Sequence, residues 1–234
     1  MPAQAVIGEE APGVYGKLPA RGDFITRRLG RAFVNAWDDW LQRAILASQS
    51  ALGARWLEIY LTSLLWRFAL GAGCFGPNTV IGVLMPSVDK VGRYFPLTLC
   101  RELEGPIELT VLAADATAWY EAVEKLALSA LGDDFRLDEL EAPVAAALSP
   151  AASSPAAVAS LAAPGNHIAV GADADLATAI RAQGPLPADR TIWWTSGSAL
   201  VSPCCLVCPG APRADAFASL LDGEWALRGW LTPQ

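Results

Sequence analysis

Three short apolar runs in the first half of the chain constrain the fold most, because turn-forming segments separate them. The runs are LLWRFAL, TVIGVLM and RYFPLTL, at residues 64–70, 79–85 and 93–99. The intervening GAGCFGPN and SVDKVG are dense in the Gly, Pro, Asn, Asp and Ser residues that are typical of loops. This alternation predicts three strands that follow one another as an antiparallel meander.

A helix is expected on each side of these strands along the chain. Residues 31–52 place their large side chains at helical spacing, so that one face carries Phe33, Trp37, Trp40, Leu41, Ala44, Ile45 and Ser48. Residues 115–131 form a second helix with Asp115 as its N-cap. Two adjacent sides of this second helix are expected to be covered, one with Ala118, Ala122, Leu126 and Ser129 and the other with Trp119, Val123, Leu126 and Ala130.

The second half of the chain continues the alternation of strand and helix. The expected elements are a strand at 167–170, a helix at about 173–183, strands at 191–195 and 199–207, and a last helix at about 215–221 that ends near Gly223. We therefore expect an α/β fold, a layered sandwich with a central mixed and largely antiparallel sheet and helices on both faces. The chain is expected to form a single domain over residues 1–234, with an Ala/Pro-rich connector at about 142–164.

Composition limits the compartment and the class of partner. The hydrophobic fraction of 53% and nine Trp residues predict a large buried core. A net charge of −7 argues against a nucleic-acid partner. No apolar run approaches the roughly 18 residues of a membrane span, and the N-terminus lacks the regions of a signal peptide. The sequence therefore predicts a cytoplasmic protein without membrane insertion.

Three of the five cysteines lie close together in CCLVC, as Cys204, Cys205 and Cys208. The last two have the spacing found in zinc and redox sites, but a closed zinc site needs four ligands. His167 is the single histidine of the chain. The apolar surroundings favour a buried strand in which Cys acts as a small hydrophobe. We expect no metal and no cofactor, and a thiol or zinc protein remains the alternative.

The segment VYGKLPARGDFITRRL, residues 14–29, combines glycines, a proline, charges and an aromatic residue. It fails the P-loop pattern at two of four fixed positions, and its RGD tripeptide is too short to carry meaning. Two interpretations remain open. In the first, the segment is an ordinary strand at Val14–Leu18 with a turn at Gly22 and a helix entry. In the second, it is a binding edge with Lys17, Arg21, Asp23, Arg27 and Arg28 facing a partner.

The segment GVLMPSVDKVGRYFPLTL, residues 82–99, has the same character. One interpretation is a hydrolase in which Ser87 is the nucleophile, assisted by Asp89 and His167. The other is a hairpin loop in which the Ser87 and Asp89 side chains bond to backbone N–H groups and Gly92 supplies an unusual conformation. The sequence favours the loop, since the only histidine is 80 residues away along the chain.

Several motifs in order resemble the TagF family, also called ImpM, of type VI secretion-associated proteins. They are VYGKLPARGDF, FVNAWDDWLQ, LWRFAL, GVLMPSVDKVGRYFPLTL and TIWWTSGS. The resemblance runs from about Tyr15 to Ser198. It implies an α/β fold and a cytoplasmic, non-catalytic protein that represses type VI secretion after translation. Such proteins act through the FHA-domain scaffold protein of the system, independently of its threonine kinase and phosphatase.

The resemblance also implies a set of binding residues. Lys17, Arg21 and Asp23 match the first family motif, and Ser87, Asp89 and Arg93 match the second. We expect the two motif loops to lie close together as one polar surface. Pairs of opposite charge, such as Asp23 with Arg93 or Asp89 with Arg21, would hold the surface in shape. Whether the surface binds a partner or only neutralises charge within the fold stays open at this point.

Overall fold

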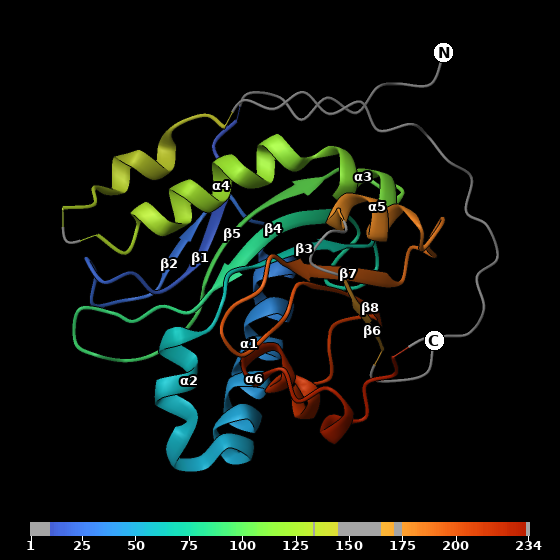
Figure 1. The fold of residues 1–234 in the computed structure, drawn as a ribbon. Helices are drawn as coiled ribbons and strands as arrows, with labels where there is room; N and C mark the ends of the chain where they lie inside the picture. The colour runs from blue at the N-terminus through green and yellow to red at the C-terminus, as the bar shows by residue number, and fades with distance from the viewer. Residues whose placement is uncertain (1–9, 133, 145–164, 171–174, 233–234) are drawn as a thin grey trace.

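The computed structural model describes residues 10–132, 134–144, 165–170 and 175–232. Eight strands form one sheet in the order β2-β1-β5-β4-β3-β7-β8-β6 (Figure 1). The strands are β1 (Gly13–Gly16), β2 (Ile25–Arg27), β3 (Trp66–Leu70), β4 (Thr79–Met85), β5 (Leu97–Leu103), β6 (Asn166–Ala169), β7 (Arg190–Thr195) and β8 (Cys204–Pro209). Every pairing of neighbouring strands in this sheet is antiparallel.

Helices cover both faces of the sheet (Figure 1). The helices on one face are α1 (Arg31–Leu52), α2 (Trp56–Thr62) and α6 (Ser219–Asp222), and those on the other are α3 (Leu109–Asp115), α4 (Thr117–Ser129) and α5 (Leu176–Arg181). Short 3-10 turns complete the connections: η1 (Gly53–Arg55), η2 (Leu137–Glu141), η3 (Ala214–Ala216) and η4 (Ala226–Arg228). The layered α/β fold expected from the sequence is thereby confirmed.

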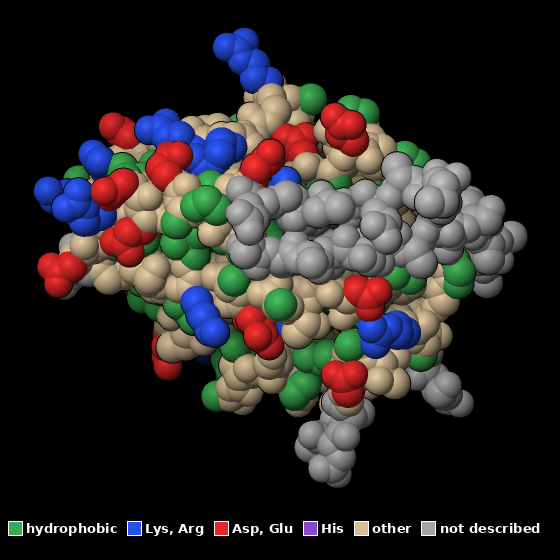
Figure 2. Space-filling model, turned by 90° about the horizontal axis from the view of Figure 1, so that it is seen from above, with side chains coloured by type: hydrophobic (Ala, Val, Ile, Leu, Met, Phe, Trp, Pro, Cys, Tyr) green, Lys and Arg blue, Asp and Glu red, His purple; other side chains and the backbone are tan. Residues whose placement is uncertain are grey.

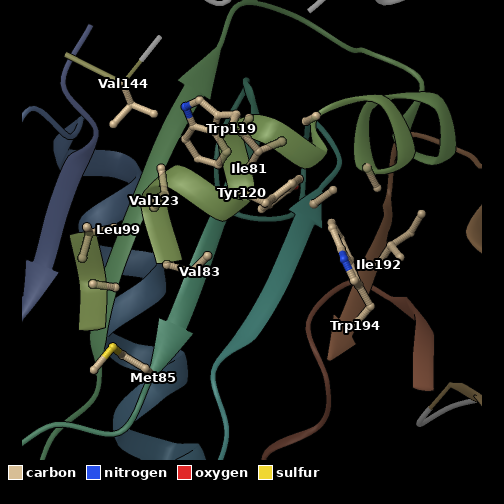
Figure 3. Close-up of a cluster of buried hydrophobic side chains, with 14 of the residues drawn as sticks. Ile81, Val83, Met85, Leu99, Trp119, Tyr120, Val123, Val144, Ile192 and Trp194 are labelled. Atoms are coloured by element: carbon tan, nitrogen blue, oxygen red, sulfur yellow. The ribbon is translucent and has the colours of Figure 1, made fainter. Parts of the chain in front are cut away.

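Successive side chains along the central strands point to opposite faces of the sheet and so form two cores, one on each face. Phe68 of β3 and Trp193 of β7 face α1, whereas their neighbours Ala69 and Ile192 face the core that α3, α4 and α5 cover. Figure 3 shows the second of these cores, in which strand side chains meet Trp119, Tyr120 and Val123 of α4. The sheet is therefore buried on both sides in its middle, which explains the near-continuous apolar runs of its strands.

Helix α1 lies as its periodicity predicts. Its buried residues are Phe33, Trp37, Trp40, Leu41, Ala44, Ile45 and Ser48, the set expected from the sequence. Trp37 stacks parallel to Trp193 at 5.9 Å between ring centroids and donates its indole N–H to Thr98 Oγ1 at 2.9 Å. Trp37 thus joins the first helix to β5 and β7, one strand from each half of the chain.

The predicted meander is confirmed, because β3, β4 and β5 are adjacent and antiparallel. Its third strand was placed too early, at 93–99, whereas β5 spans Leu97–Leu103. Arg93 to Phe95 instead belong to the loop, where the N–H of Phe95 donates to the carbonyl of Ser87. The apolar character of Tyr94 and Phe95 reflects packing under the loop rather than a strand.

The second helix differs from the expectation at its start. Asp115 is the last residue of α3 rather than an N-cap, and the cap of α3 is Glu108, whose carboxylate accepts from the N–H groups of Thr110 and Val111. Of its two expected sides, the side with Trp119 and Val123 is buried. The side that begins at Ala118 is exposed or partly exposed.

In the second half, the strands at Asn166–Ala169 and Arg190–Thr195 and the helix Leu176–Arg181 agree with the expected elements within a few residues. Strand β8 begins at Cys204 rather than 199, since the N–H of Ser198 bonds to Val201 in a turn that precedes Pro203. The expected connector at about 142–164 falls almost wholly outside the described residues. No helix in the described part of the chain is long and apolar enough to cross a bilayer.

Candidate functional site

The two motif loops, residues 17–24 and 86–95, lie side by side at the end of the sheet that carries β2 and β1. Pairing of β1 with β5 places Gly16 opposite Leu97. The first loop therefore begins at the end of β1, next to the point where the second loop ends and β5 begins. The N–H of Lys90 donates to the carbonyl of Arg21 at 2.9 Å, and Ser87 Oγ donates to the carbonyl of Lys17 at 2.8 Å. The expected juxtaposition of the two motifs is confirmed.

Gly16 permits this close approach. It has a φ of +130°, and a Cβ on it would lie 2.1 Å from the carbonyl oxygen of Pro96. Any side chain there would push the strands apart and strain the backbone. In the second loop, Gly92 has a φ of +85° and its N–H donates to the backbone carbonyl of Asp89, so glycine also closes the tight turn between Asp89 and Arg93.

Asp89 is the centre of the loop contacts, and its carboxylate is fully covered. Oδ1 accepts from the N–H groups of Val91 at 3.0 Å and Arg93 at 2.9 Å. Oδ2 lies 2.9 Å from Nζ of Lys17 and accepts from Nε of Arg93 at 2.7 Å. One buried carboxylate therefore joins the end of β1 to the turn of the second loop.

The electrostatics of Asp89 follow from these contacts. Burial opposes ionisation of the carboxyl group, but the Arg93 N–H, the Lys17 ammonium and the Arg93 guanidinium outweigh it. Together they hold the pKa of Asp89 well below its usual range. Asp89 is thus ionised at neutral pH, and its charge serves to hold Lys17 and Arg93 rather than to exchange a proton.

One of the two expected charge pairs is present. Arg93 Nη2 lies 3.9 Å from Oδ1 of Asp23, and the same guanidinium donates to the carbonyl of Gly22. The expected pair between Asp89 and Arg21 was wrong, because Lys17 and Arg93 occupy the carboxylate. The backbone carbonyl of Arg21 instead accepts the N–H of Lys90 in the second loop, and the Arg21 side chain is exposed.

Ser87 and Tyr60 fix the base of the second loop. The Tyr60 hydroxyl donates to the Ser87 carbonyl and accepts from the Ser87 N–H, both at 3.0 Å. The Ser87 hydroxyl is buried and directed to the Lys17 backbone. Ser87 is thus a loop residue, as the second interpretation held, but its hydroxyl donates to a backbone carbonyl and the expected bond to a backbone N–H was wrong.

The arrangement proposed for a hydrolase does not exist in the structure. His167 lies on β6, four strands from β4, which corresponds to ~19 Å at the usual strand spacing. Its ring stacks on Trp225 at 4.3 Å, and burial lowers its pKa to about 4. Ser87, Asp89 and His167 therefore do not converge, and this interpretation of the motif was wrong.

The cysteine motif is a buried strand. Alternation along β8 directs Cys204 and Cys208 to the α1 face and Cys205 to the α4 face, so the two cysteines of the C-x-x-C spacing point apart. Burial raises the pKa of Cys204 to about 12, which suppresses the thiolate. Among the described residues, no group of three or more His, Cys, Asp and Glu side chains could hold a metal ion.

Phe24 was not among the expected site residues, although it closes the first motif. Its ring is 48% exposed. It packs against Phe95 at 4.8 Å and Tyr15 at 5.9 Å between centroids, and lies over Nζ of Lys17 at 5.1 Å. The RGDF string offered a signal for it, since an exposed aromatic residue beside charges is typical of interfaces. Lys90 was also missed, and its side chain is exposed beside Arg21.

Comparison with known proteins identifies the relatives of the chain. Residues 13–147 match the family described as TagF N-terminal domain, type VI secretion system-associated. The chain belongs to the TagF family. Comparison of this TagF protein with curated proteins gives no match.

A solved structure extends the likeness beyond the matched region. The crystal structure of PA0076 from Pseudomonas aeruginosa PAO1 is 39% identical, with a TM-score of 0.76 over 95% of this chain and 97% of that one. The likeness to this solved structure therefore extends beyond residue 147, to the part of the chain that contains β6, β7 and β8. The family resemblance stated from the motifs is confirmed.

Proposed function

We propose that this TagF protein is a non-catalytic, post-translational repressor of type VI secretion that acts in the cytoplasm by binding the FHA-domain scaffold protein of the system. The binding surface consists of both motif loops, with Lys17, Arg21, Asp23, Ser87, Asp89 and Arg93. Membership of a type VI secretion-associated family supports the cellular process. The geometry of the motif loops supports binding rather than chemistry.

The single observation that carries the proposal is that some polar residues of the motif loops are buried and fix the loops, whereas others on the same loops are exposed. Asp89, Lys17 and Ser87 are buried and use their polar atoms to fix the loops. Arg21, Asp23 and Arg93 are exposed on the same loops. A rigid base under exposed charged groups presents a surface with little ordering cost on binding. Pure charge neutralisation within the fold accounts for Arg93, which pairs with Asp89, but it does not require the exposed Arg21.

The test is a titration of the purified full-length chain against the FHA-domain scaffold of the same secretion system. Arg93→Ala is compared with Arg43→Ala, because each arginine is exposed and pairs with an Asp four residues earlier. We expect the wild type and Arg43→Ala to bind alike. Arg93→Ala should weaken binding on the order of tenfold, as removal of an interfacial Arg does.

Two results would refute parts of the proposal. Absence of binding by the wild type would exclude the scaffold as the partner. Equal binding by Arg93→Ala and Arg43→Ala would remove the motif loops from the interface. Thermal melts of both variants accompany the titration, so that loss of binding is attributed to the surface only when the variant is folded. Overproduction of the wild type should also suppress secretion in the parent bacterium, whereas Arg93→Ala should not.

A further inference from the structure

The motif loops and the adjoining strand β2 carry cations for which the described residues provide no ion pair. Lys17 and Arg93 are balanced by Asp89 and Asp23. Within the part of the chain that the structure describes, no ion pair is found for Arg21, Arg27 or Lys90. These three residues give a local excess of positive charge on a protein whose net charge is −7.

Arg21 and Arg27 line a hollow beside an apolar anchor, and the backbone of Lys90 is hydrogen-bonded to Arg21. Residues 21–27 and Leu137 of η2 line a depression of about 330 Å³. Phe24 forms part of its wall, and contacts with Tyr15 and Phe95 hold the ring in place. Val91 is exposed on the adjacent loop at 68%. A fixed aromatic ring within a charged rim has the anatomy of a protein interface.

The wider setting agrees with this picture. Figure 2 shows that Lys and Arg side chains gather with Asp and Glu on the left side of the molecule, the side on which β2 and the motif loops lie in Figure 1. Mixed charge at this edge also protects the short edge strand β2 against pairing with other chains. Because charges of both signs occur at this edge, selectivity for a partner must come from the positions of the unpaired cations.

We propose that the motif loops, together with Arg27 of β2, dock an acidic segment of a partner protein, whose Asp and Glu carboxylates engage Arg21, Arg27 and Lys90 while an apolar side chain covers Phe24. For the identity of the partner, this inference rests on the proposed function. Guanidinium groups bind carboxylates with two parallel hydrogen bonds, which favours a partner with fixed acidic side chains. Three cations on an acidic protein do not form a track for nucleic acid, whose affinity depends on many phosphate contacts.

The first arm of the test titrates the full-length chain with the FHA-domain scaffold at rising NaCl concentration. The charge-reversed variant Arg21→Glu/Lys90→Glu is compared with Arg43→Glu, which reverses an exposed arginine on α1. Arg21 and Lys90 join the loops through backbone atoms only, so their substitution should leave the fold intact. We expect the reversed variant to bind on the order of tenfold or more weakly, with slower association. Wild-type affinity should fall as salt screens the contact.

The second arm uses immobilised poly-L-glutamate as the probe. The wild type and Arg43→Glu should be retained on poly-L-glutamate at low salt, and Arg21→Glu/Lys90→Glu should not. Phe24→Ala should weaken scaffold binding without changing retention on poly-L-glutamate, because Phe24 supplies the apolar contact.

The arms separate the failure of this inference from the failure of the proposed function. If the scaffold binds the charge-reversed variant as tightly as the wild type, the acidic docking site is refuted and the repressor role stands. If the scaffold does not bind but the chain is retained on poly-L-glutamate through Arg21 and Lys90, the docking site stands and the partner is another protein. Loss of scaffold binding after phosphatase treatment would overturn the inference, since phosphate rather than carboxylate would then be recognised.

Discussion

At the scale of the residue, Asp89 accepts from three donors of its own loop and joins that loop to the first through Lys17. The sequence predicted that Asp89 bonds to backbone N–H groups, because an Asp near Gly92 in a short loop favours that geometry. It did not predict Lys17 as the charge partner. Lys17 follows Gly16, and only the antiparallel pairing of β1 with β5 places its ammonium group at the second loop.

Loss of the Lys17 charge should destabilise the fold more than loss of an exposed charge. In Lys17→Met the carboxylate of Asp89 remains buried with one cation fewer. The free energy of unfolding should fall by more than in Arg43→Met, where about 1 kcal/mol is the upper limit for an exposed pair. Urea denaturation measures both, and Lys17→Met/Asp89→Asn should recover part of the loss. Equal costs in the two single variants would contradict the central role of the pair.

His167 should make stability depend on pH between 6.5 and 5. Burial lowers its pKa to about 4, whereas the unfolded chain has the ordinary value of about 6.5. Between these values the unfolded state binds more protons, so the free energy of unfolding decreases as pH falls. His167 is the only histidine, and His167→Gln should reduce the dependence of the free energy of unfolding on pH in this range. Urea midpoints at pH 7, 6 and 5 give the slope. An unchanged slope in the variant would contradict the assignment.

At the scale of the element, long periodic segments were predictable and short ones were not. Helix α1 has six turns of consistent spacing, and its buried face was predicted residue by residue. Strand β2 has three residues, too few for a pattern, and exists because β1 offers it a partner. Helix α3 was missed because the cap at Glu108 lies outside the Ser, Thr, Asp and Asn set that marks helix starts.

Truncation of Trp37 tests the contribution of α1 to the core. Its ring is fully buried among Trp40, Phe68, Phe75 and Trp193. Trp37→Ala should lower the free energy of unfolding by about 3–5 kcal/mol, because it removes the ring contacts and leaves a cavity. Leu46→Ala, on the exposed side of the same helix, should change it by about 0.5 kcal/mol or less. Similar urea midpoints for the two variants would contradict the burial of Trp37.

At the scale of the whole molecule, the sheet includes strands from beyond the region that matches the family. Residues 13–147 contain β1 to β5, and β6 to β8 extend the same sheet from the edge of β3. The fold class could be predicted from the order of apolar and turn segments. The strand order could not, because β7 pairs with β3 across more than a hundred residues and nothing local encodes that pairing.

A chain ending at residue 147 should therefore fail to fold cooperatively. Its β3 would become an exposed edge, and Phe68 and Trp37 would lose Trp193 from the core. Unpaired apolar edges also promote aggregation. Far-UV circular dichroism and urea denaturation of residues 1–147 should show no sharp transition, whereas the 234-residue chain unfolds in one step. The alternative is two domains, in which case the fragment would unfold cooperatively with a native-like near-UV spectrum. A single domain over residues 1–234 requires that the fragment does not fold and that the 234-residue chain unfolds in one cooperative step. In such a domain, the motif loops depend on a sheet that the C-terminal strands complete.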